Sequence, residues 1–211
     1  MSKNSKRALI IFLLLLLYLI PILFLYVTHR PNNNASMVMG KGNLTPVARV
    51  YARITYPTDT LFEDSKRVEY TGGSIRLVVP RMELDTTVGD GVDDATLQSS
   101  PGLYDNAQLP SLGNPNVSIA GHRDIHGSPF YSIDKLQKGD NVYLVYDGSI
   151  FCYQWEETVI VQPNDWSIIH CRPYSAVTLT SCEPIGTTEK RIVAVGRLKG
   201  IEEETPNFVF D

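Results

Sequence analysis

Cys182 has sequence surroundings that suit a nucleophile. It follows the apolar, strand-like run 177–181 (VTLTS) and precedes the loop-like run 183–186 (EPIG). We therefore expect it at the end of a strand, where a side chain can face a binding surface. A thiol attacks a carbonyl only as thiolate, and it needs a basic or cationic neighbour and a donor for the oxyanion. Taken alone, Cys182 is more simply explained as a buried structural cysteine.

Arg191 stands where it could supply the cation. It comes nine residues after Cys182 and opens the apolar run 192–196, which predicts another strand. Consecutive strands joined by a short loop are usually neighbours, so we expect both side chains on one surface. An exposed arginine without a catalytic role fits the same position.

His122 is the candidate base and acid. The run Ile119–Gly121 ends in a small residue and a glycine, which predicts that His122 is presented at the tip of a strand. Here the plain alternative is a surface histidine in a turn. His126 follows four residues later, but Gly127 and Pro129 disfavour the helix in which such a pair binds a metal. We predict no metal site.

Together these segments resemble the signature of the sortases. Thr178–Cys182 reads TLTSC where the family has TLxTC, Arg191 lies on the following strand, and Ala120–Asp124 (AGHRD) supplies the preceding histidine. The resemblance extends over residues 73–198. The runs after His122 and Cys182, and the lack of a C-terminal membrane span, are most similar to the class D/E housekeeping-type sortases.

The resemblance implies a mostly β fold, an eight-stranded β-barrel with short helices, and a cysteine transpeptidase. In such an enzyme Cys182 attacks a peptide carbonyl and forms a thioester. His122 protonates the leaving amine and later deprotonates the incoming one. Arg191 orients the peptide or stabilises the oxyanion.

The resemblance also implies the binding partners. The substrate would be an LPxTG-like sorting signal on a surface protein, held in part by Ala120, Thr180 and Ser181. The acceptor would be an amine on a cell-wall precursor or another surface protein. Ser181 departs from the family's threonine but keeps the hydroxyl, so hydrogen bonding to the substrate or to Arg191 is expected to survive.

Two other functions stay open at this point. A cysteine peptidase would use the same thioester with water as the acceptor, and a surface β-domain that binds a partner would need no catalysis. No cofactor is implied. Calcium dependence stays undecided, because loop carboxylates fit solvated charges as well as cation ligands: Glu83, Asp85, Asp93 and Asp94.

The N-terminus predicts a membrane anchor. Residues 8–27 are apolar or nearly so, and twenty residues of helix span about 30 Å, the thickness of the hydrocarbon core. The basic residues Lys3, Lys6 and Arg7 precede them, which favours a cytoplasmic segment 1–7. We expect a single-pass protein of a bacterial plasma membrane with an extracytoplasmic catalytic domain.

The remaining chain divides into a stalk or N-terminal extension (28–72), a catalytic domain (73–200) and a tail (201–211). Asp147–Ser149 predicts a hairpin turn, and 129–136 a short helix. Six apolar runs between turn signals predict strands of a β-barrel or sandwich: 75–79, 117–120, 142–146, 150–160, 176–180 and 191–198.

Composition excludes one class of partner. The formal net charge is −4, and no cluster of Lys and Arg suits a phosphate backbone, so we predict no nucleic-acid binding. Three cysteines are too few for a disulfide scaffold. Cys152 and Cys171 fit either a disulfide or two buried small residues.

Overall fold

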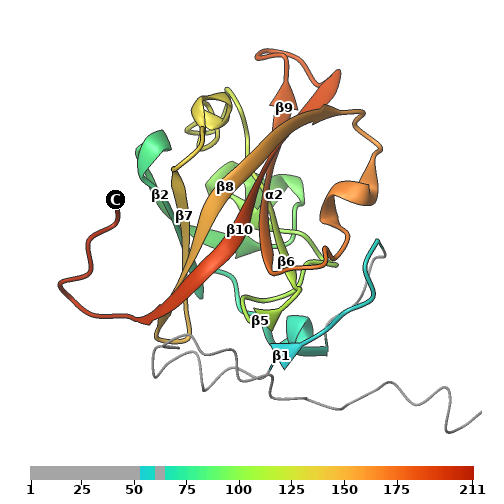
Figure 1. Ribbon diagram of the computed structural model, residues 1–211. Helices are drawn as coiled ribbons and strands as arrows, with labels where there is room; N and C mark the ends of the chain where they lie inside the picture. Colours follow the sequence, from blue (N-terminus) through green and yellow to red (C-terminus); the bar gives the residue numbers. More distant parts are fainter. Residues whose placement is uncertain (1–52, 60–64) are drawn as a thin grey trace, which may run out of the picture. The chain divides into compact units, whose positions relative to one another are not determined.

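The computed structural model describes residues 53–59 and 65–211 (Figure 1). The predicted cytoplasmic segment 1–7 and membrane anchor 8–27 lie outside these residues. Across the described ranges, no helix is long and apolar enough to cross a membrane. The anchor therefore stays a prediction.

Eight strands close into a barrel in the order β10-β8-β7-β2-β3-β4-β6-β9. Six of the eight neighbouring pairs are antiparallel, whereas β3–β4 and β6–β9 are parallel. The predicted eight-stranded barrel is thus confirmed. Its strands are β2 (Ile75–Val79), β3 (Leu84–Asp90), β4 (Gly102–Leu103), β6 (Asn116–Ala120), β7 (Asn141–Tyr146), β8 (Ser149–Val161), β9 (Ala176–Glu183) and β10 (Lys190–Glu203).

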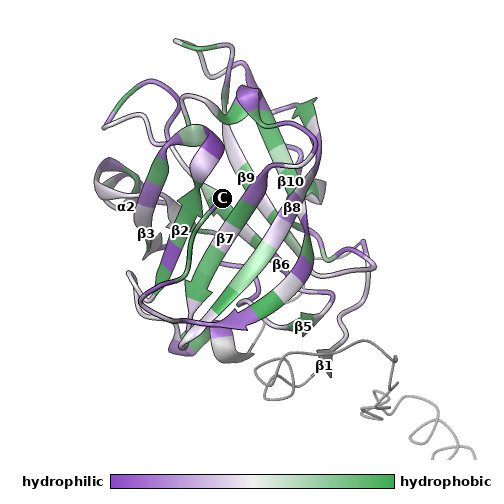
Figure 2. Cartoon of the chain, turned by 60° about the vertical axis from the view of Figure 1, so that its left-hand side comes forward, coloured by the Kyte–Doolittle hydropathy of each residue, from purple (hydrophilic) through white to green (hydrophobic). Residues whose placement is uncertain are grey.

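The barrel interior holds the main core. Side chains alternate between the two faces of each strand, and Figure 2 shows that the strands carry both hydrophobic and hydrophilic residues. On β9, for example, Val177 and Leu179 point into the core, while Thr178 and Thr180 lie on the other face. Two smaller apolar clusters cover outer faces of the barrel.

The predicted hairpin joins β7 to β8. Tyr146 pairs with Ser149, so the loop consists of Asp147 and Gly148 alone. Both have positive φ, 51° and 69°, as a type I′ turn requires. This turn matches the right-handed twist of the strands and fixes the register of β7 against β8.

Short helices connect the strands. The only α-helix among the described residues, α2 (Asp94–Ser99), is capped by Asp93, whose carboxylate accepts from the backbone of Ala95 and Thr96. The helix expected at 129–136 is reduced to a 3₁₀ turn, η4 (Ile133–Lys135). There the backbone bonds span three residues rather than four, which gives a 3₁₀ turn. Two further 3₁₀ turns are η3 (Pro80–Met82) and η5 (Trp166–Ile169).

The described part of the N-terminal extension packs on the barrel. β1 (Arg53–Ile54) pairs in parallel with β5 (Leu112–Gly113). Asn114 bonds both backbone groups of Tyr56, at 2.6 and 2.8 Å. After η2 (Ser65–Glu69), Tyr70 joins the main core. The described residues before 73 therefore belong with the barrel, while the predicted boundaries themselves stay untested.

The C-terminal tail folds back on the outside of the barrel. After β10, Phe208 and Phe210 pack edge-on against Tyr143 of β7, with ring centroids 5.8 and 5.2 Å from it. The Tyr143 hydroxyl donates to the Asp211 carboxylate at 2.5 Å. These residues complete one of the two outer apolar clusters.

Candidate active site

Cys182 and Arg191 lie directly opposite each other. They form a register pair of the antiparallel strands β9 and β10, and the side chains of such a pair share one face, with Cβ atoms about 4.5–5.5 Å apart. Alternation from the core residue Leu179 puts Cys182 on the outer face, together with Thr180. The sequence predicted this proximity from loop length alone, and strand pairing produces it.

His122 lies on the other side of Cys182. β6 runs parallel to β9 with Ala120 paired to Thr180, and the Gly121 N–H continues the ladder by donating to the Thr180 carbonyl at 3.0 Å. His122 follows immediately, beside the end of β9 that carries Cys182. Three adjacent strands, β6, β9 and β10, thus bring the predicted histidine, cysteine and arginine together.

The charge of His122 is set by its surroundings. Partial burial lowers its pKa below the usual 6.5, and the nearby imidazole of His126 lowers it further, with the ring centroids 5.0 Å apart. The carboxylates of Asp94 and Asp124 act in the opposite direction without reversing the shift. Neutral imidazole is therefore favoured at neutral pH, and the cationic form is the minor one.

Arg191 has donors to offer a ligand. Its Nη1 donates to the backbone carbonyls of Thr188 and Lys190, at 3.2 and 3.0 Å. Within the described residues Nε and Nη2 have no hydrogen-bond partner. A planar guanidinium anchored through one nitrogen can present the other two to an oxyanion or a peptide carbonyl.

The three residues predicted to bind substrate lie next to Cys182, His122 and Arg191. The two that carry hydroxyls, Ser181 and Thr180, use them for hydrogen bonds inside the protein. Ser181 points inward and its Oγ donates to the Gly121 carbonyl at 2.7 Å. This bond differs from the substrate or Arg191 contact that the sequence suggested. Thr180 Oγ1 shares a 2.8 Å hydrogen bond with the Tyr104 hydroxyl, and Ala120 pairs with Thr180 through the backbone. Their substrate-binding roles stay predictions.

Tyr104 is a site residue that the sequence did not single out. Burial raises the pKa of its phenol. The charge of Arg191 lowers this pKa and the charge of Cys182 raises it, so the phenol lies within electrostatic reach of both residues. The exposed Trp166 of η5 meets its ring edge-on at 6.3 Å. The only sequence signal was the run Pro101–Leu103 before it, which carries no information on a contact 76 residues away.

The other cysteines are not placed to react. All three cysteines are free, so Cys152 and Cys171 do not form the disulfide that the sequence left open. Cys171 is buried and its thiol donates to Gln108 at 3.3 Å. Burial raises the pKa of Cys152 to about 11, which disfavours its thiolate.

Two of the four loop carboxylates considered as calcium ligands have partners within the protein. Asp85 forms a two-point ion pair with Arg76, and Asp93 caps α2. In the part of the chain that the structure describes, no group of three or more His, Cys, Asp or Glu side chains is arranged to hold a metal ion.

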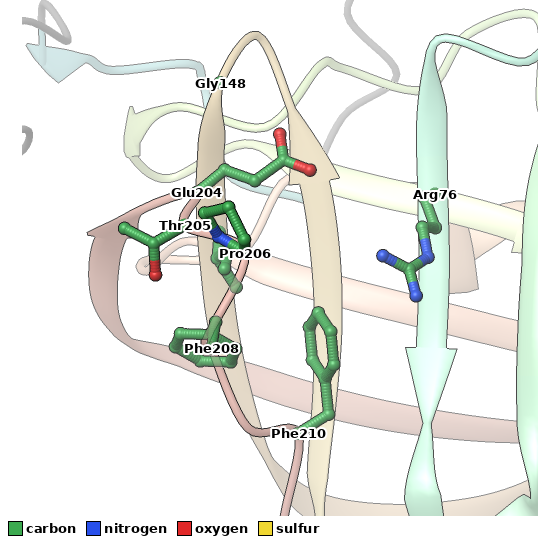
Figure 3. Close-up of a pocket in the computed structure, with 8 residues that line it drawn as sticks. Arg76, Gly148, Glu204, Thr205, Pro206, Phe208 and Phe210 are labelled. Carbon is green, nitrogen blue, oxygen red and sulfur yellow. The ribbon is translucent and has the colours of Figure 1, made fainter.

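A hollow of about 640 Å³ lies elsewhere, between the C-terminal tail and the outside of the barrel. Figure 3 shows Phe208 and Phe210 over the β7–β8 hairpin, with Arg76 on the neighbouring strand β2. None of His122, Cys182 and Arg191 lines it. The hollow therefore belongs to the packing of the tail rather than to the candidate active site.

Comparison with known proteins agrees with this geometry. Residues 77–199 match the sortase domain family. Sortase A of Listeria monocytogenes is 29% identical over 130 residues, 61% of this chain and 58% of that protein, and sortase D of Bacillus subtilis is 29% identical over 125 residues, 57% and 61%. The chain thus spans about half to three fifths of the length of these curated relatives.

Solved structures show the same barrel. The crystal structure of Listeria monocytogenes sortase A superimposes with a TM-score of 0.57 at 28% identity, covering 63% of this chain and 91% of that one. Sortase E1 from Streptomyces coelicolor, solved with a tripeptide in its active site, gives 0.61 at 22% identity, covering 65% and 94%. With the family match over more than half of its residues, the chain belongs to the sortase family.

Proposed function

We propose that this sortase is a cysteine transpeptidase that joins a surface protein to an amine acceptor. One observation carries the proposal: the thiol of Cys182 lies opposite Arg191 and beside His122, on the ends of three adjacent strands. A nucleophile, an acid–base group and a cationic donor on one outer face are the groups that acyl transfer requires.

The first half of the reaction forms an acyl-enzyme. The Cys182 thiolate attacks the carbonyl carbon of the scissile peptide bond, and Nε and Nη2 of Arg191 face the resulting oxyanion. When the tetrahedral intermediate collapses, the C–N bond breaks and the imidazolium of His122 gives its proton to the leaving amine. The products are a thioester on Cys182, a free amine and neutral His122.

The second half restores the enzyme. An incoming amine attacks the thioester carbonyl, and neutral His122 accepts the proton that the amine loses. Collapse forms the new amide and expels the Cys182 thiolate, so thiolate and imidazolium are both regenerated. The cycle consumes no cofactor and leaves the total number of peptide bonds unchanged.

The family and the N-terminal sequence support the proposed substrate and location. Membership of the sortases supports an LPxTG-like sorting signal as donor and a cell-wall precursor or surface-protein amine as acceptor. The apolar run 8–27 behind three basic residues supports a single-pass anchor in a bacterial plasma membrane, with the barrel outside.

The test is mass spectrometry of the enzyme after incubation with a library of LPxTG-like peptides, with and without an added amine. We expect an adduct on the fragment that contains Cys182 and a transfer product that appears only with the amine. Hydrolysis unaffected by amines would show a peptidase instead. No adduct with any peptide would favour a non-catalytic surface domain. Cys182→Ala is the matched control and should form neither adduct nor product.

A further inference from the structure

Arg123, the residue after His122, is buried although it carries a charge. Its side chain is 2% exposed. A buried cation is tolerated only when it is paired and its donors are satisfied, and here Nη2 contacts Asp134 at 2.9 Å and Nη1 contacts Glu183 at 2.8 Å. Nε donates to the Tyr131 carbonyl at 2.9 Å.

These partners belong to different parts of the fold. Tyr131 and Asp134 lie in the connection between β6 and β7, which also contains His122. Glu183 is the last residue of β9, next to Cys182, and Nη1 also donates to the Cys182 carbonyl at 3.4 Å. The guanidinium therefore joins the connection that carries the histidine to the strand end that carries the cysteine.

The residue before His122 is fixed to the same strand. The Gly121 N–H donates to Thr180, and the Gly121 carbonyl accepts from Ser181. His122 thus stands between two residues that are both attached to β9. Gly121 contacts the strand just before Cys182, and Arg123 contacts it at Cys182 and at Glu183. The first attachment uses the strand ladder, whereas the second depends on one side chain.

We propose that Arg123 is a positioning residue, whose guanidinium sets where the His122 imidazole stands relative to the Cys182 sulfur. The proposal rests on the proposed function, because it assigns the purpose of this spacing to proton transfer during transpeptidation. A shift of about 1 Å in a reacting group can cost on the order of 10²-fold in rate. An arginine is needed, because a lysine ammonium cannot hold three differently directed acceptors in one plane.

The experiment compares variants that loosen the attachment to different degrees. Arg123→Lys and Arg123→Gln remove the guanidinium. Glu183→Ala removes the partner of Arg123 on β9, whereas Glu183→Gln keeps a side-chain oxygen that can still accept a hydrogen bond from Nη1. Arg81→Gln is the matched control, because it breaks an exposed ion pair, to Asp140. Each variant is assayed for kcat and KM with a sorting peptide, for thermal unfolding, and for the titration of His122 by NMR.

We expect Arg123→Lys and Glu183→Ala to lose about 10–100-fold in kcat with KM changed less than about threefold, and the His122 titration to move. Glu183→Gln should recover most of the activity, and Arg81→Gln should stay within about twofold of the wild type. Folded Arg123 variants with normal kcat and an unchanged His122 titration would overturn the proposal. If both Arg123 variants fail to fold, the two Glu183 variants decide by the same criteria.

The outcome is separable from that of the proposed function. If the wild type cleaves no sorting peptide, the transpeptidase assignment fails. The position of His122 is then judged from its titration and from the rate of Cys182 alkylation by iodoacetamide. A change in both in Arg123→Lys supports the positioning role, and no change in either refutes it.

Discussion

At the scale of the residue, the proposed reaction depends on the protonation of His122. Thioester formation needs the imidazolium, but burial and His126 lower the His122 pKa. The cation is lost as pH rises through this lowered pKa, so a smaller fraction of enzyme carries it at neutral pH than an ordinary histidine would give. Acylation needs this cation and the Cys182 thiolate at the same time, so a lowered His122 pKa reduces the fraction of enzyme that can react.

His126→Gln tests this cause. Removing the neighbouring imidazole takes away one of the two influences that lower the pKa of His122, so its titration midpoint should move up and a larger fraction of the enzyme should carry the cation at neutral pH. Asp124→Asn should do the reverse, because that carboxylate raises the pKa. NMR titration of the His122 ring measures both. No shift of the His122 titration in either variant would show that burial alone controls the group.

Arg191→Lys should impair turnover although the positive charge is kept. Lysine offers a flexible point charge, whereas the planar guanidinium of Arg191 is held through Nη1 on two backbone carbonyls and keeps two further nitrogens as donors. We expect kcat to fall by about 10²–10³, the effect of losing one oxyanion donor. Single-turnover thioester formation measures it. A variant with near-normal turnover would reduce the role of Arg191 to diffuse electrostatics.

At the scale of the element, the junction after β6 has almost no spare space. A Cβ on Gly121 would stand 2.9 Å from the Phe130 ring, and the Phe130 N–H binds the His122 carbonyl. Gly121→Ala must therefore displace Phe130 or His122. We expect about 1–3 kcal/mol of destabilisation and a fall in kcat.

Gly200→Ala is the matched control for this steric cost. Gly200 lies in β10, has no positive φ and would place its Cβ in open space. Denaturant unfolding and peptide cleavage should leave it near the wild type. Equal losses in the two variants would mean that the Gly121 effect comes from the backbone rather than from Phe130.

The elements that the sequence predicted are those with buried, alternating side chains. The run 75–79 coincides with β2, and the other five predicted runs fall within β6–β10. β3 was missed because only Val88 of its seven residues is buried, so no apolar pattern marks it. It forms because the backbone of residues 84–88 pairs with all of β2, and Gly89 and Asp90 pair with β4.

The candidate site was predicted in part for a similar reason. His122, Cys182 and Arg191 stand in recognisable motifs, so their types and order are visible in the sequence. Arg123 reads as an ordinary surface charge, because its partner Glu183 lies 60 residues away. The Tyr104–Thr180 bond spans 76 residues. Contacts of this kind follow from the closure of the barrel and leave no local signal.

At the scale of the whole molecule, the catalytic candidates and the packing of the C-terminal tail lie on different sides of the barrel. The catalytic candidates occupy β6, β9 and β10, whereas the tail residues Phe208 and Phe210 cover β7 and β8. The tail closes an apolar face formed by Val78, Tyr143, Val145 and Ile150. Such a face would otherwise be exposed, a feature that promotes association.

Replacing Phe208 and Phe210 by alanine should therefore cost stability without changing the chemistry. Both rings are only partly buried, so we expect about 1–3 kcal/mol in the free energy of unfolding, together with a tendency to self-associate. Urea denaturation and light scattering measure these effects. Thioester formation by the folded fraction should stay within about twofold, because none of His122, Cys182 and Arg191 belongs to the apolar cluster that the two rings join. A large loss of kcat in a variant of unchanged stability would mean that the tail acts on the site through the barrel. The path would be the β8–β10 pairing, which joins the strand under the tail directly to a strand of the candidate site.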